Sequence, residues 1–503
     1  MTKVRLFLLF ALVFLTIGIC AVPWPGDWSD TVPGNSEYEP TFVNLWSLWY
    51  GGEVLAGRQN LSHTDLINRP EGVDLYPNAP QFWMMLWSPF TQKWGPEIAL
   101  NLATWIGLYL TFLCAALFFW EISGDLYPGV IAGAVFVLYG FPMLDVNIGS
   151  IATAAPFLIP LAAFFIVRTI DRGAFVYGLL AVVCSVAAFY YHFIFGAIIV
   201  VFAALAAVWA LFDEGVGAML RGIGLVGTIL ALASPLLLDY AKLPDTYFAM
   251  ADSGFPAGAR LHFLLLVPGV AIFGATVATW FIRKEAAFWL VVAAVFGLLI
   301  PLTAAWHPFD AHLVPDPKRW ALGASLGLCA AIAMGLRRLL DFLEAQERDE
   351  SLPTRGILFL VLITAAFILP NNNFRLKFPE AYTHLTSSSV LAVQDVSPSA
   401  KRYTPELYYQ TRHKRPIMTP YNPLLPHFAT YFTANGLAQT GLKNPVFSEK
   451  ISEEPKALKA AGATQLLLRH TGIDQFPLKW QEHLDEFGPV VFQGDGGELH
   501  RLP

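Results

Sequence analysis

The sequence has few charged residues and few cysteines for its length. Only 14% of its 503 residues are Asp, Glu, Lys or Arg, against about 25% in a typical soluble domain. The formal net charge is −6 and there is no basic patch, so we expect no nucleic-acid partner. The four cysteines lie inside apolar runs, which excludes a disulfide-held secreted scaffold and predicts core thiols: Cys20, Cys114, Cys184 and Cys329.

Signature motifs of common nucleotide- and metal-dependent enzymes are also missing. No P-loop, no GxGxxG after a strand, no HExxH and no GxSxG occurs in a meaningful context, and the sequence contains no internal repeat or low-complexity tract. Any chemistry must therefore come from individual acidic and basic side chains. We expect no cofactor, and nothing in the sequence indicates a divalent metal.

Apolar residues dominate what is present. They make up 55% of the sequence, and the mean hydropathy is +0.51, which is more apolar side chain than a soluble fold needs. Charge is unevenly distributed, because residues 371–503 hold 26 charged side chains and the first 370 residues hold 44. We predict a mainly α-helical, polytopic membrane domain over residues 1–370 and a small α/β domain outside the membrane over residues 371–503.

Eleven segments are apolar enough to cross a membrane, which takes about 20 mostly apolar residues. The first follows Lys3 and Arg5, as a signal peptide would, but no A-x-A cleavage pattern follows it, so we expect a retained helix. The predicted spans are residues 4–22, 97–120, 127–143, 150–168, 174–191, 193–212, 222–239, 261–282, 286–305, 320–336 and 356–370.

Lysine and arginine in the short loops indicate the orientation, since cytoplasmic loops are enriched in both. The long connections at residues 23–96, 240–260, 306–319 and 371–503 then share the outer face with the C-terminus. The N-terminus lies in the cytoplasm, and so do the basic residues Lys3, Arg5, Arg168, Arg172, Arg221, Arg283, Lys284, Arg337, Arg338, Arg348 and Arg355.

The first outer loop, residues 23–96, contains two helical patterns. Phe42, Leu45, Trp46 and Trp49 follow the spacing of one apolar helix stripe, and residues 79–90 are rich in aromatic side chains. Because tryptophan favours the headgroup level of a bilayer, both stretches are predicted to be interfacial helices. The alternative is that their aromatic side chains pack against the outer domain.

The tail has the patterns of a small α/β domain. β-rich runs alternate with segments of helical character, and a glycine-containing turn at residues 494–497 predicts a terminal hairpin. The predicted strands are residues 388–396, 464–468, 489–493 and 498–502, and the predicted helices are residues 405–412 and 477–487.

Candidate functional side chains gather on the predicted outer face. An acid in a hydrated loop is usually solvated, and a histidine at a helix end is usually a cap, so no residue identifies the site alone. His307-x-x-Asp310-x-His312 has metal-ligand residue types but no further ligand in view, so no metal site is predicted. All of these residues are predicted to lie on the same face of the membrane and near the same depth, so together they form one candidate site. They are Asp27, Asp30, Glu37, Glu39, Asp145, His192, His307, Asp310, His312, Lys318 and Arg319.

Short sequence motifs are distributed along the chain. They are Leu45-Trp46-Ser47-Leu48-Trp49, Gly57, Thr64-Asp65, Pro70-Glu71-Gly72-Val73, Gly95-Pro96, Asn101-Leu102, Gly133-Ala134-Val135-Phe136, Gly140-Phe141-Pro142, Pro317-Lys318-Arg319 and Tyr408-Tyr409-Gln410-Thr411-x-His413-x-x-Pro416-Ile417. Together they resemble the bacterial multispan proteins of the GT-C glycosyltransferase superfamily, in the branch with a long first outer loop and a C-terminal outer domain. These motifs are spread over most of the chain, and they are more specific for the family than for an activity.

The resemblance implies a glycosyltransferase of a bacterial inner membrane that moves a sugar from a polyprenyl-phosphate donor to an acceptor outside the cytoplasm. It also implies that an acid of the first outer loop acts as base. In the branch this acid lies shortly before the tryptophan helix, often as Asp-Pro, and the present chain has Glu39-Pro40 there. We rank Glu39 and Asp27 first as the base, followed by Asp30 and Glu37.

A cation late in the chain would complement such an acid. The phosphate leaving group needs positive charge, which Lys318 and Arg319 can supply, and the acceptor hydroxyl needs a carboxylate within about 3 Å to take its proton. The expected partners are the sugar lipid, a glycan, lipid or protein acceptor, and membrane lipids. We expect the remaining set to help bind the substrates: Asp145, His192, His307, Asp310 and His312.

Two other functions stay open. One is a non-catalytic GT-C-like subunit of an envelope or surface assembly, which would keep the fold without the chemistry. The other is a transporter, which the pattern disfavours because ionisable side chains are nearly absent from the span centres.

Reporter fusions test the predicted orientation. The bias of Lys and Arg places the N-terminus, Asp213 and Glu347 in the cytoplasm and His63, Asp252 and Asp310 outside. Alkaline phosphatase fused at Leu484 should be active, because eleven spans leave the tail outside. An intact but inactive fusion at that position would show that the number of spans is even.

Overall fold

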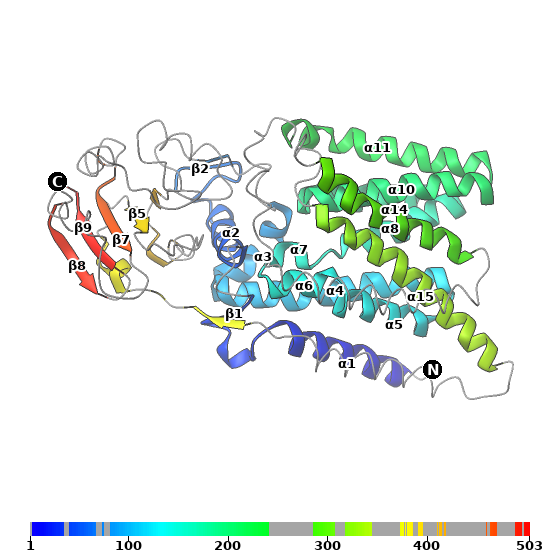
Figure 1. Cartoon of the computed structure of the whole chain (residues 1–503), viewed down its shortest axis with the longest axis horizontal. Helices are drawn as coiled ribbons and strands as arrows, with labels where there is room; N and C mark the ends of the chain where they lie inside the picture. Colours follow the sequence, from blue (N-terminus) through cyan, green and yellow to red (C-terminus); the bar gives the residue numbers. More distant parts are fainter. Residues whose placement is uncertain are drawn as a thin grey trace. The chain divides into compact units, whose positions relative to one another are not determined.

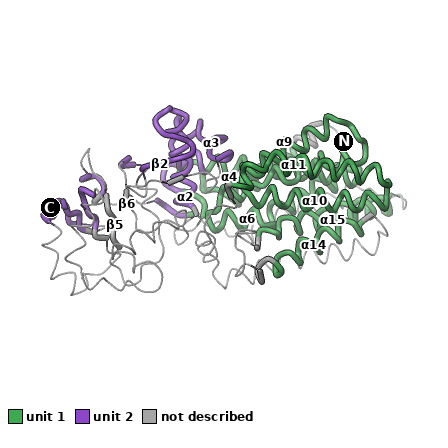
Figure 2. Tube along the Cα trace, turned by 90° about the horizontal axis from the view of Figure 1, so that it is seen from above, with its two compact units in different colours: residues 1–28, 32–35, 101–373 green, residues 29–31, 36–100, 374–503 purple. Residues whose placement is uncertain are grey.

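Two compact units make up the chain (Figure 2). Unit 1 comprises Met1–Trp28, Val32–Asn35 and Asn101–Asn373, and unit 2 comprises Ser29–Thr31, Ser36–Leu100 and Phe374–Pro503. Most of the first outer loop is therefore grouped with the tail. The computed structural model describes residues 3–34, 40–66, 73–74, 81–240, 285–306, 317–344, 373–376, 378, 380–385, 391–395, 410, 412–414, 417–418, 459, 463–469, 488–494 and 497–502.

Unit 1 is a bundle of apolar helices that pack side by side (Figure 1). Nine of the eleven predicted spans are confirmed as helical, and the other two, residues 261–282 and 356–370, lie outside the described residues. The helices are α1 (Lys3–Ala21), α4 (Pro96–Ser123), α5 (Leu126–Leu138), α6 (Phe141–Asn147), α7 (Ile151–Ala154), α8 (Leu158–Arg172), α9 (Phe175–Tyr191), α10 (Phe193–Asp213), α11 (Val216–Tyr240), α14 (Glu285–Trp306) and α15 (Ala321–Glu344).

The helices of unit 1 have the length and composition of membrane spans. Within the described part of the chain, six helical stretches are long and apolar enough to cross a membrane, and three further apolar helices are shorter. Large apolar side chains are exposed on α9 and α11, as lipid-facing helices require, among them Phe175, Leu179, Leu220, Ile223 and Leu238. The protein is thus a multipass membrane protein. Its four cysteines are free and none is exposed, as predicted.

Helix α5 approaches α4 closely because two of its glycines face it. Gly129 and Gly133 have the small-xxx-small spacing that lets helix backbones touch in membranes. A methyl group added at Gly129 would lie 2.7 Å from the backbone nitrogen of Trp120, and one at Gly133 would lie 2.9 Å from that of Ala116. Neither position has room for a side chain without movement of the backbone.

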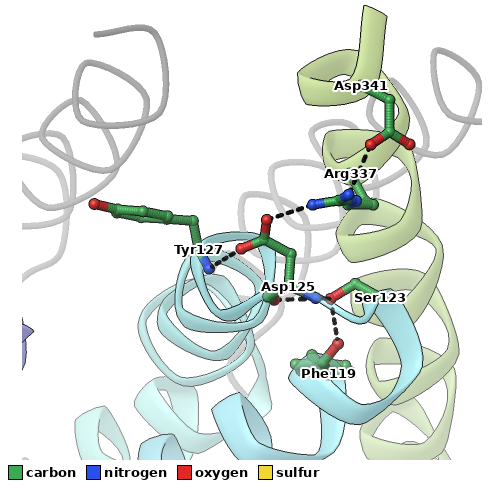
Figure 3. A network of polar contacts seen from close by, with 6 residues as sticks. All are labelled: Phe119, Ser123, Asp125, Tyr127, Arg337 and Asp341. Carbon is green, nitrogen blue, oxygen red and sulfur yellow. Dashed lines mark hydrogen bonds and ion pairs between the residues drawn. The ribbon is translucent and has the colours of Figure 1, made fainter. Parts of the chain in front are cut away.

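Charged side chains of unit 1 pair at the helix ends. Asp125 caps α5 by accepting a hydrogen bond from the backbone N–H of Tyr127 at 2.9 Å, and Arg337 of α15 contacts both Asp125 at 2.6 Å and Asp341 at 2.9 Å (Figure 3). On neighbouring helices Arg168 donates two hydrogen bonds to Glu121, at 2.9 and 2.7 Å.

Four of the predicted cytoplasmic arginines, Arg168, Arg172, Arg221 and Arg337, therefore share one end of unit 1. Arg221 reaches the carbonyl oxygen of Ile170, which lies beside Arg172 on α8. Because the helices alternate in direction, the turns at residues 148–150 and His192 and the start of α15 lie at the opposite end. Which side of the membrane each end faces stays a prediction.

In unit 2, helices α2 (Pro40–Leu55) and α3 (Gln81–Trp94) pack on each other and confirm the two helical patterns of the first loop. The apolar stripe of α2 does not face a membrane: Phe42, Leu45, Trp46 and Trp49 are all at most 7% exposed. The indole N–H of Trp46 donates to the side-chain oxygen of Gln410 at 2.7 Å. A buried indole needs such an acceptor, so this stripe packs on the tail, as the alternative predicted.

Membrane contact of α3 stays a prediction. Part of this helix is buried, including Trp83 and Trp87, while Phe82, Leu86 and Trp94 are exposed by 38–43%. These three exposed side chains are the apolar surface that α3 offers.

The tail contains a five-stranded sheet in the order β6-β5-β7-β9-β8. β5 runs parallel to β6 and β7, with Leu391 opposite Gln465, whereas β9 is antiparallel to β7 and β8. The four predicted strands are confirmed as β5 (Leu391–Asp395), β7 (Gln465–Arg469), β8 (Val490–Gly494) and β9 (Gly497–Arg501). Leu466, Leu467 and Leu499 are buried and form the core of the sheet.

The remaining elements are two predicted helices of the tail and several short strands. The predicted helix at residues 477–487 lies outside the described residues, and of that at 405–412 only Gln410 and Arg412 are described. The sequence did not predict β6 (Ile417–Met418), or the pairs formed by β1 (Thr31–Pro33) with β4 (Asn373–Arg375) and by β2 (His63–Thr64) with β3 (Val73–Asp74). These strands have two or three residues each, too few for a periodic pattern.

The close approach of α4 and α5 can be tested by adding one side chain. Gly133→Val should lower the free energy of unfolding by about 1–3 kcal/mol, because overpacking forces the helices apart. Gly224→Val on α11 is the matched control, since no described atom lies within 4 Å of its added methyl group. The measurement is unfolding in detergent. Equal effects of the two substitutions would contradict the packing of α5 on α4.

Candidate functional site

A buried ion pair lies at the end of unit 1 opposite the arginine cluster. Asp145 belongs to α6, and Arg319 belongs to the 3₁₀ helix η2 (Pro317–Trp320) directly before α15. A guanidinium nitrogen of Arg319 (Nη1) donates to Oδ2 of Asp145 at 2.8 Å, and the two side chains are only 10% and 0% exposed. Two residues that are 174 positions apart in sequence thus form one ion pair.

Two hydroxyl groups complete the ion pair. Thr153 donates to the same carboxylate oxygen of Asp145 at 2.6 Å, and the second terminal nitrogen of Arg319 (Nη2) donates to Oγ of Ser150 at 3.3 Å. The carboxylate is therefore held from two sides, by a charge and by a hydroxyl.

Local backbone geometry brings these hydroxyls to the pair. Gly149 has φ +78°, a left-handed conformation that only glycine adopts at little cost. The turn brings the backbone N–H of Ser150 to the carbonyl oxygen of Asp145 at 2.8 Å. Thr153 then lies on the first turn after the bend, in the short helix α7.

His192 lies next to this pair. It stands between α9 and α10 with extended backbone angles of φ −163° and ψ 127°. Burial, and then the positive charge of Arg319, lower the pKa of His192 to about 3. The imidazole is therefore neutral at physiological pH and can offer one hydrogen-bond donor and one acceptor.

Several buried polar atoms around the pair are unsatisfied. In the described part of the chain, Nδ1 of His192, both amide atoms of Asn147 and the indole nitrogen of Trp320 have no hydrogen-bond partner. Asn147 is two residues from Asp145 and Trp320 directly follows Arg319. Because buried polar groups are normally paired, this end of the bundle has spare capacity to bind polar atoms of a ligand or water.

Asp27 is an exposed acid whose segment is anchored to unit 1. It closes the 3₁₀ helix η1 (Pro25–Asp27), and the next residue, Trp28, packs edge-on against Trp105 of α4. The side chain of Asn101 donates to the carbonyl oxygen of Trp28 at 3.5 Å. Since α1 leads into η1 and contacts α6, Asp27 lies at the same end of unit 1 as Asp145.

Asp30 lies in a different environment, in unit 2. Its carboxylate accepts hydrogen bonds from Arg375 at 2.7 Å and from the hydroxyl of Thr31 at 3.0 Å. These two hydrogen bonds, Thr31 first, lower the pKa of Asp30. An acid held in this way has reduced basicity.

The side chains of the other predicted site residues are not described by the structure. Glu37, Glu39, His307, Asp310 and His312 lie outside the described residues, and of Lys318 only the backbone in η2 is described. Of the predicted set, the structure brings together Asp145, His192 and Arg319. Among the described residues no group of three or more His, Cys, Asp or Glu side chains could hold a metal ion.

Sequence reasoning missed the hydroxyl partners of the pair. Ser150 and Thr153 are small polar residues inside the apolar run IGSIATA, and the glycine before them was the available signal. It also missed the ion pair of Glu97 with Arg412 at 2.5 Å in unit 2, where Glu97 is nearly buried. Nothing in local spacing connects residues so far apart.

Unit 2 has an open, polar hollow of its own. The hollow has a volume of about 560 Å³ and is formed by the loop after α2. The hydroxyl of Tyr50 donates to the carbonyl oxygens of Asn60 at 2.6 Å and His63 at 3.1 Å and so fixes this loop. The lining side chains include Arg58, Gln59, Asn60, His63 and Asp65.

The burial of the Asp145–Arg319 pair can be tested by stability. Asp145→Ala should lower the free energy of unfolding by about 3–5 kcal/mol, because it leaves a buried cation without its partner. Asp341→Ala removes a partner of Arg337 in a pair that is 37–38% exposed and should cost about 0–1 kcal/mol. Chemical unfolding in detergent measures both. Similar small losses would indicate that water reaches Asp145.

Comparisons with known proteins concern the fold. No family model and no curated protein matches the sequence. Among solved structures, the chain is similar to the Archaeoglobus fulgidus oligosaccharyltransferase in complex with zinc and sulfate, at 12% identity and a TM-score of 0.51, over 92% of this chain and 68% of that one. It is similar to the same organism's AglB in complex with an inhibitory peptide and a dolichol-phosphate, at 11% identity and a TM-score of 0.50, over 93% and 70%. AglB is a GT-C glycosyltransferase, so the resemblance seen in the sequence is confirmed at the level of the fold.

Proposed function

We propose that the protein is a membrane glycosyltransferase that moves a sugar from a polyprenyl-phosphate donor to an acceptor outside the cytoplasm. The observation that carries this proposal is the buried arginine Arg319. It lies at one end of a GT-C-type helix bundle, oriented by Asp145 and Ser150 and surrounded by unsatisfied polar groups.

A lipid-linked donor fits the surface of unit 1. Helices α9 and α11 expose apolar side chains along their length, and a polyprenyl chain can lie against such a surface. Outside the cytoplasm there is no pool of nucleotide sugars, so the donor must be tethered to the membrane. The similar AglB structure contains a dolichol-phosphate, which supports a lipid phosphate as the donor group.

Arg319 is suited to the phosphate of this donor. A guanidinium has five N–H donors in a planar fork that matches phosphate oxygens. Asp145 and Ser150 each accept one hydrogen bond from its two terminal nitrogens, so the side chain is oriented. Neutral His192 adds hydrogen-bonding capacity beside Arg319 without adding a charge.

The transfer then needs one base. The acceptor oxygen attacks the anomeric carbon of the sugar, and its proton passes to a first-loop carboxylate. The bond between that carbon and the phosphate oxygen breaks, and the electron pair leaves with the phosphate, whose charge Arg319 stabilises. Asp27 and Glu39 are the proposed bases.

The proposal includes the orientation of the chain in a bacterial inner membrane. The arginine-rich end with Arg168, Arg172 and Arg337 faces the cytoplasm, since its loops carry the basic residues. The end with Asp145 and Arg319 then faces outward, on the side of the acceptor.

Arg319→Lys tests the role of the guanidinium. The variant keeps the charge but loses the planar fork, and removal of a donor to a developing charge typically costs about 10²–10³ in kcat. The assay is release of polyprenyl phosphate from a panel of radiolabelled lipid-linked sugars by purified protein. Arg337→Lys at the other end is the matched control and should retain turnover. If the parent protein turns over no sugar lipid, the non-catalytic subunit becomes the better hypothesis.

Single substitutions identify the base. Among Asp27→Asn, Asp30→Asn, Glu37→Gln and Glu39→Gln, one should lose about 10²–10⁴ in rate, the usual contribution of a general base. Its melting temperature should hold, because a solvated loop carboxylate contributes about 0.5 kcal/mol or less to stability. Turnover within a few-fold of the parent in all four variants would exclude the first loop as the source of the base.

A further inference from the structure

We infer that the polar hollow of unit 2 is a binding site for an uncharged glycan, and that this glycan is the acceptor of the proposed transfer. The second part rests on the proposed function, because it names the acceptor class. The hollow is formed by the loop that follows α2 and contains β2 (Figure 1). Of its seven lining residues, only Leu61 has an apolar side chain.

Buried side chains hold the loop around the hollow in place. The hydroxyl of Tyr50 contacts the carbonyl oxygens of Asn60 and His63, and the amide nitrogen of Gln410 donates to the carbonyl oxygen of Leu66 at 2.7 Å. Tyr50 and Gln410 are both 0% exposed. Loops at the surface are usually mobile, whereas a binding site must be ordered before its ligand arrives. These buried anchors provide that order.

The beginning of the loop is fixed by an ion pair and a turn. Arg58 donates from Nε and Nη2 to the two carboxylate oxygens of Glu53, at 2.5 and 2.9 Å. Gly57 has φ +71°, the left-handed conformation that glycine adopts at little cost. The side chain of Gln81 donates to the carbonyl oxygen of Leu61 at 3.4 Å. The lining backbone is thus held on both sides of Gln59.

The polar groups of the lining match sugar hydroxyls. An amide side chain offers donors and an acceptor side by side, and a hydroxyl is itself a donor and an acceptor. Oδ1 of Asn60 accepts from the backbone N–H and the hydroxyl of Ser62, at 3.1 and 3.0 Å, which orients its amide. In the described structure no hydrogen bond commits the side chain of Gln59, so both of its polar atoms can serve a ligand.

Other ligand classes fit the hollow less well. A lipid tail or a peptide needs apolar anchors, and Leu61 is the one lining side chain of that kind. Arg58 and Lys414 balance Glu53 and Asp65, and Lys414 acts electrostatically on Glu53, so no net charge favours an ionic ligand. The volume of about 560 Å³ lies within the usual range of small-ligand sites, about 300–1,000 Å³. A short uncharged oligosaccharide meets all three conditions.

A glycan array tests the site without any assumption about catalysis. Full-length protein in detergent is applied to short uncharged oligosaccharides, oligosaccharides that carry uronic acid, and peptides. The parent should bind uncharged glycans, and Gln59→Ala should weaken this binding about 5- to 10-fold, as loss of a hydrogen bond does. Gln493→Ala, at an exposed glutamine of β8 outside the hollow, is the matched control and should bind as the parent does. Absence of binding to uncharged glycans, or equal affinities of the two variants, would overturn the site.

Tyr50→Phe tests the contribution of loop order. The variant keeps the ring, which stacks on Trp46 at 4.9 Å, and loses the hydroxyl that holds the loop. Amides of residues 57–65 should exchange several-fold faster with solvent, and glycan binding should weaken although no lining side chain has changed. Unchanged exchange would contradict the hold of Tyr50 on the loop. Faster exchange with unchanged glycan affinity would contradict an ordered site.

Kinetics test the acceptor role. With the sugar lipid turned over by the parent and the best-bound glycan as acceptor, Gln59→Ala should raise the KM for the glycan about 5- to 10-fold. The value of kcat should stay constant, because the hollow contributes binding and no chemistry. Glycan binding with an unchanged KM would overturn the acceptor role. If the parent releases no polyprenyl phosphate, the proposed function fails and the acceptor role with it, while the array still decides whether the hollow binds glycans.

Discussion

The cost of a charge in a dry interior is the constraint on which the site depends. Asp145 is completely buried in a helical unit where water is scarce, and an isolated carboxylate there would be strongly disfavoured. Arg319 supplies the compensating charge and Thr153 a further hydrogen bond. Because each charge requires the other, the turn after α6 and the start of α15 must remain together whenever unit 1 is folded. A binding site built on this pair is rigid before any ligand arrives.

The same constraint arranges the rest of unit 1. Between its ends the helices pack through apolar side chains and, at Gly129 and Gly133, through direct backbone contact. Ion pairs occur where helices begin and end, such as that of Arg168 with Glu121. At the arginine-rich end Arg168, Arg172, Arg221 and Arg337 are each paired with an acid, whereas described residues at the end with Asp145 keep unsatisfied donors and acceptors. That difference in unused hydrogen-bonding capacity distinguishes a structural end from a candidate site.

Sequence patterns predicted the elements better than the contacts between them. Spans and strands follow from periodicity and apolar length, so nine of the predicted spans are helical and the four predicted strands appear where they were expected. Local patterns also predicted the helix at Trp46 but not which surface covers it, since the partner, Gln410, is 364 residues away. The pairing of Asp145 with Arg319 is equally non-local. Both residues were candidates because they lie in turns at the predicted outer face, and that topological argument was enough to bring them into one set without predicting the bond.

The three described acids of the predicted site, Asp27, Asp30 and Asp145, differ in what their carboxylates are free to do. Asp145 is committed to Arg319 and Thr153, and Asp30 is committed to Arg375 and Thr31. The hydrogen bonds from Thr31 and Arg375 lower the pKa of Asp30, and one carboxylate oxygen of Asp145 is engaged by both Arg319 and Thr153. Both acids are therefore better suited to hold structure than to act as base. Asp27 is exposed, and in the described structure it takes part in no ion pair. Its neighbours Trp28 and Asp30 are each fixed to other parts of the protein. Because Asp27 directly precedes the fixed residue Trp28, it combines an available carboxylate with a defined position, the two requirements of a general base.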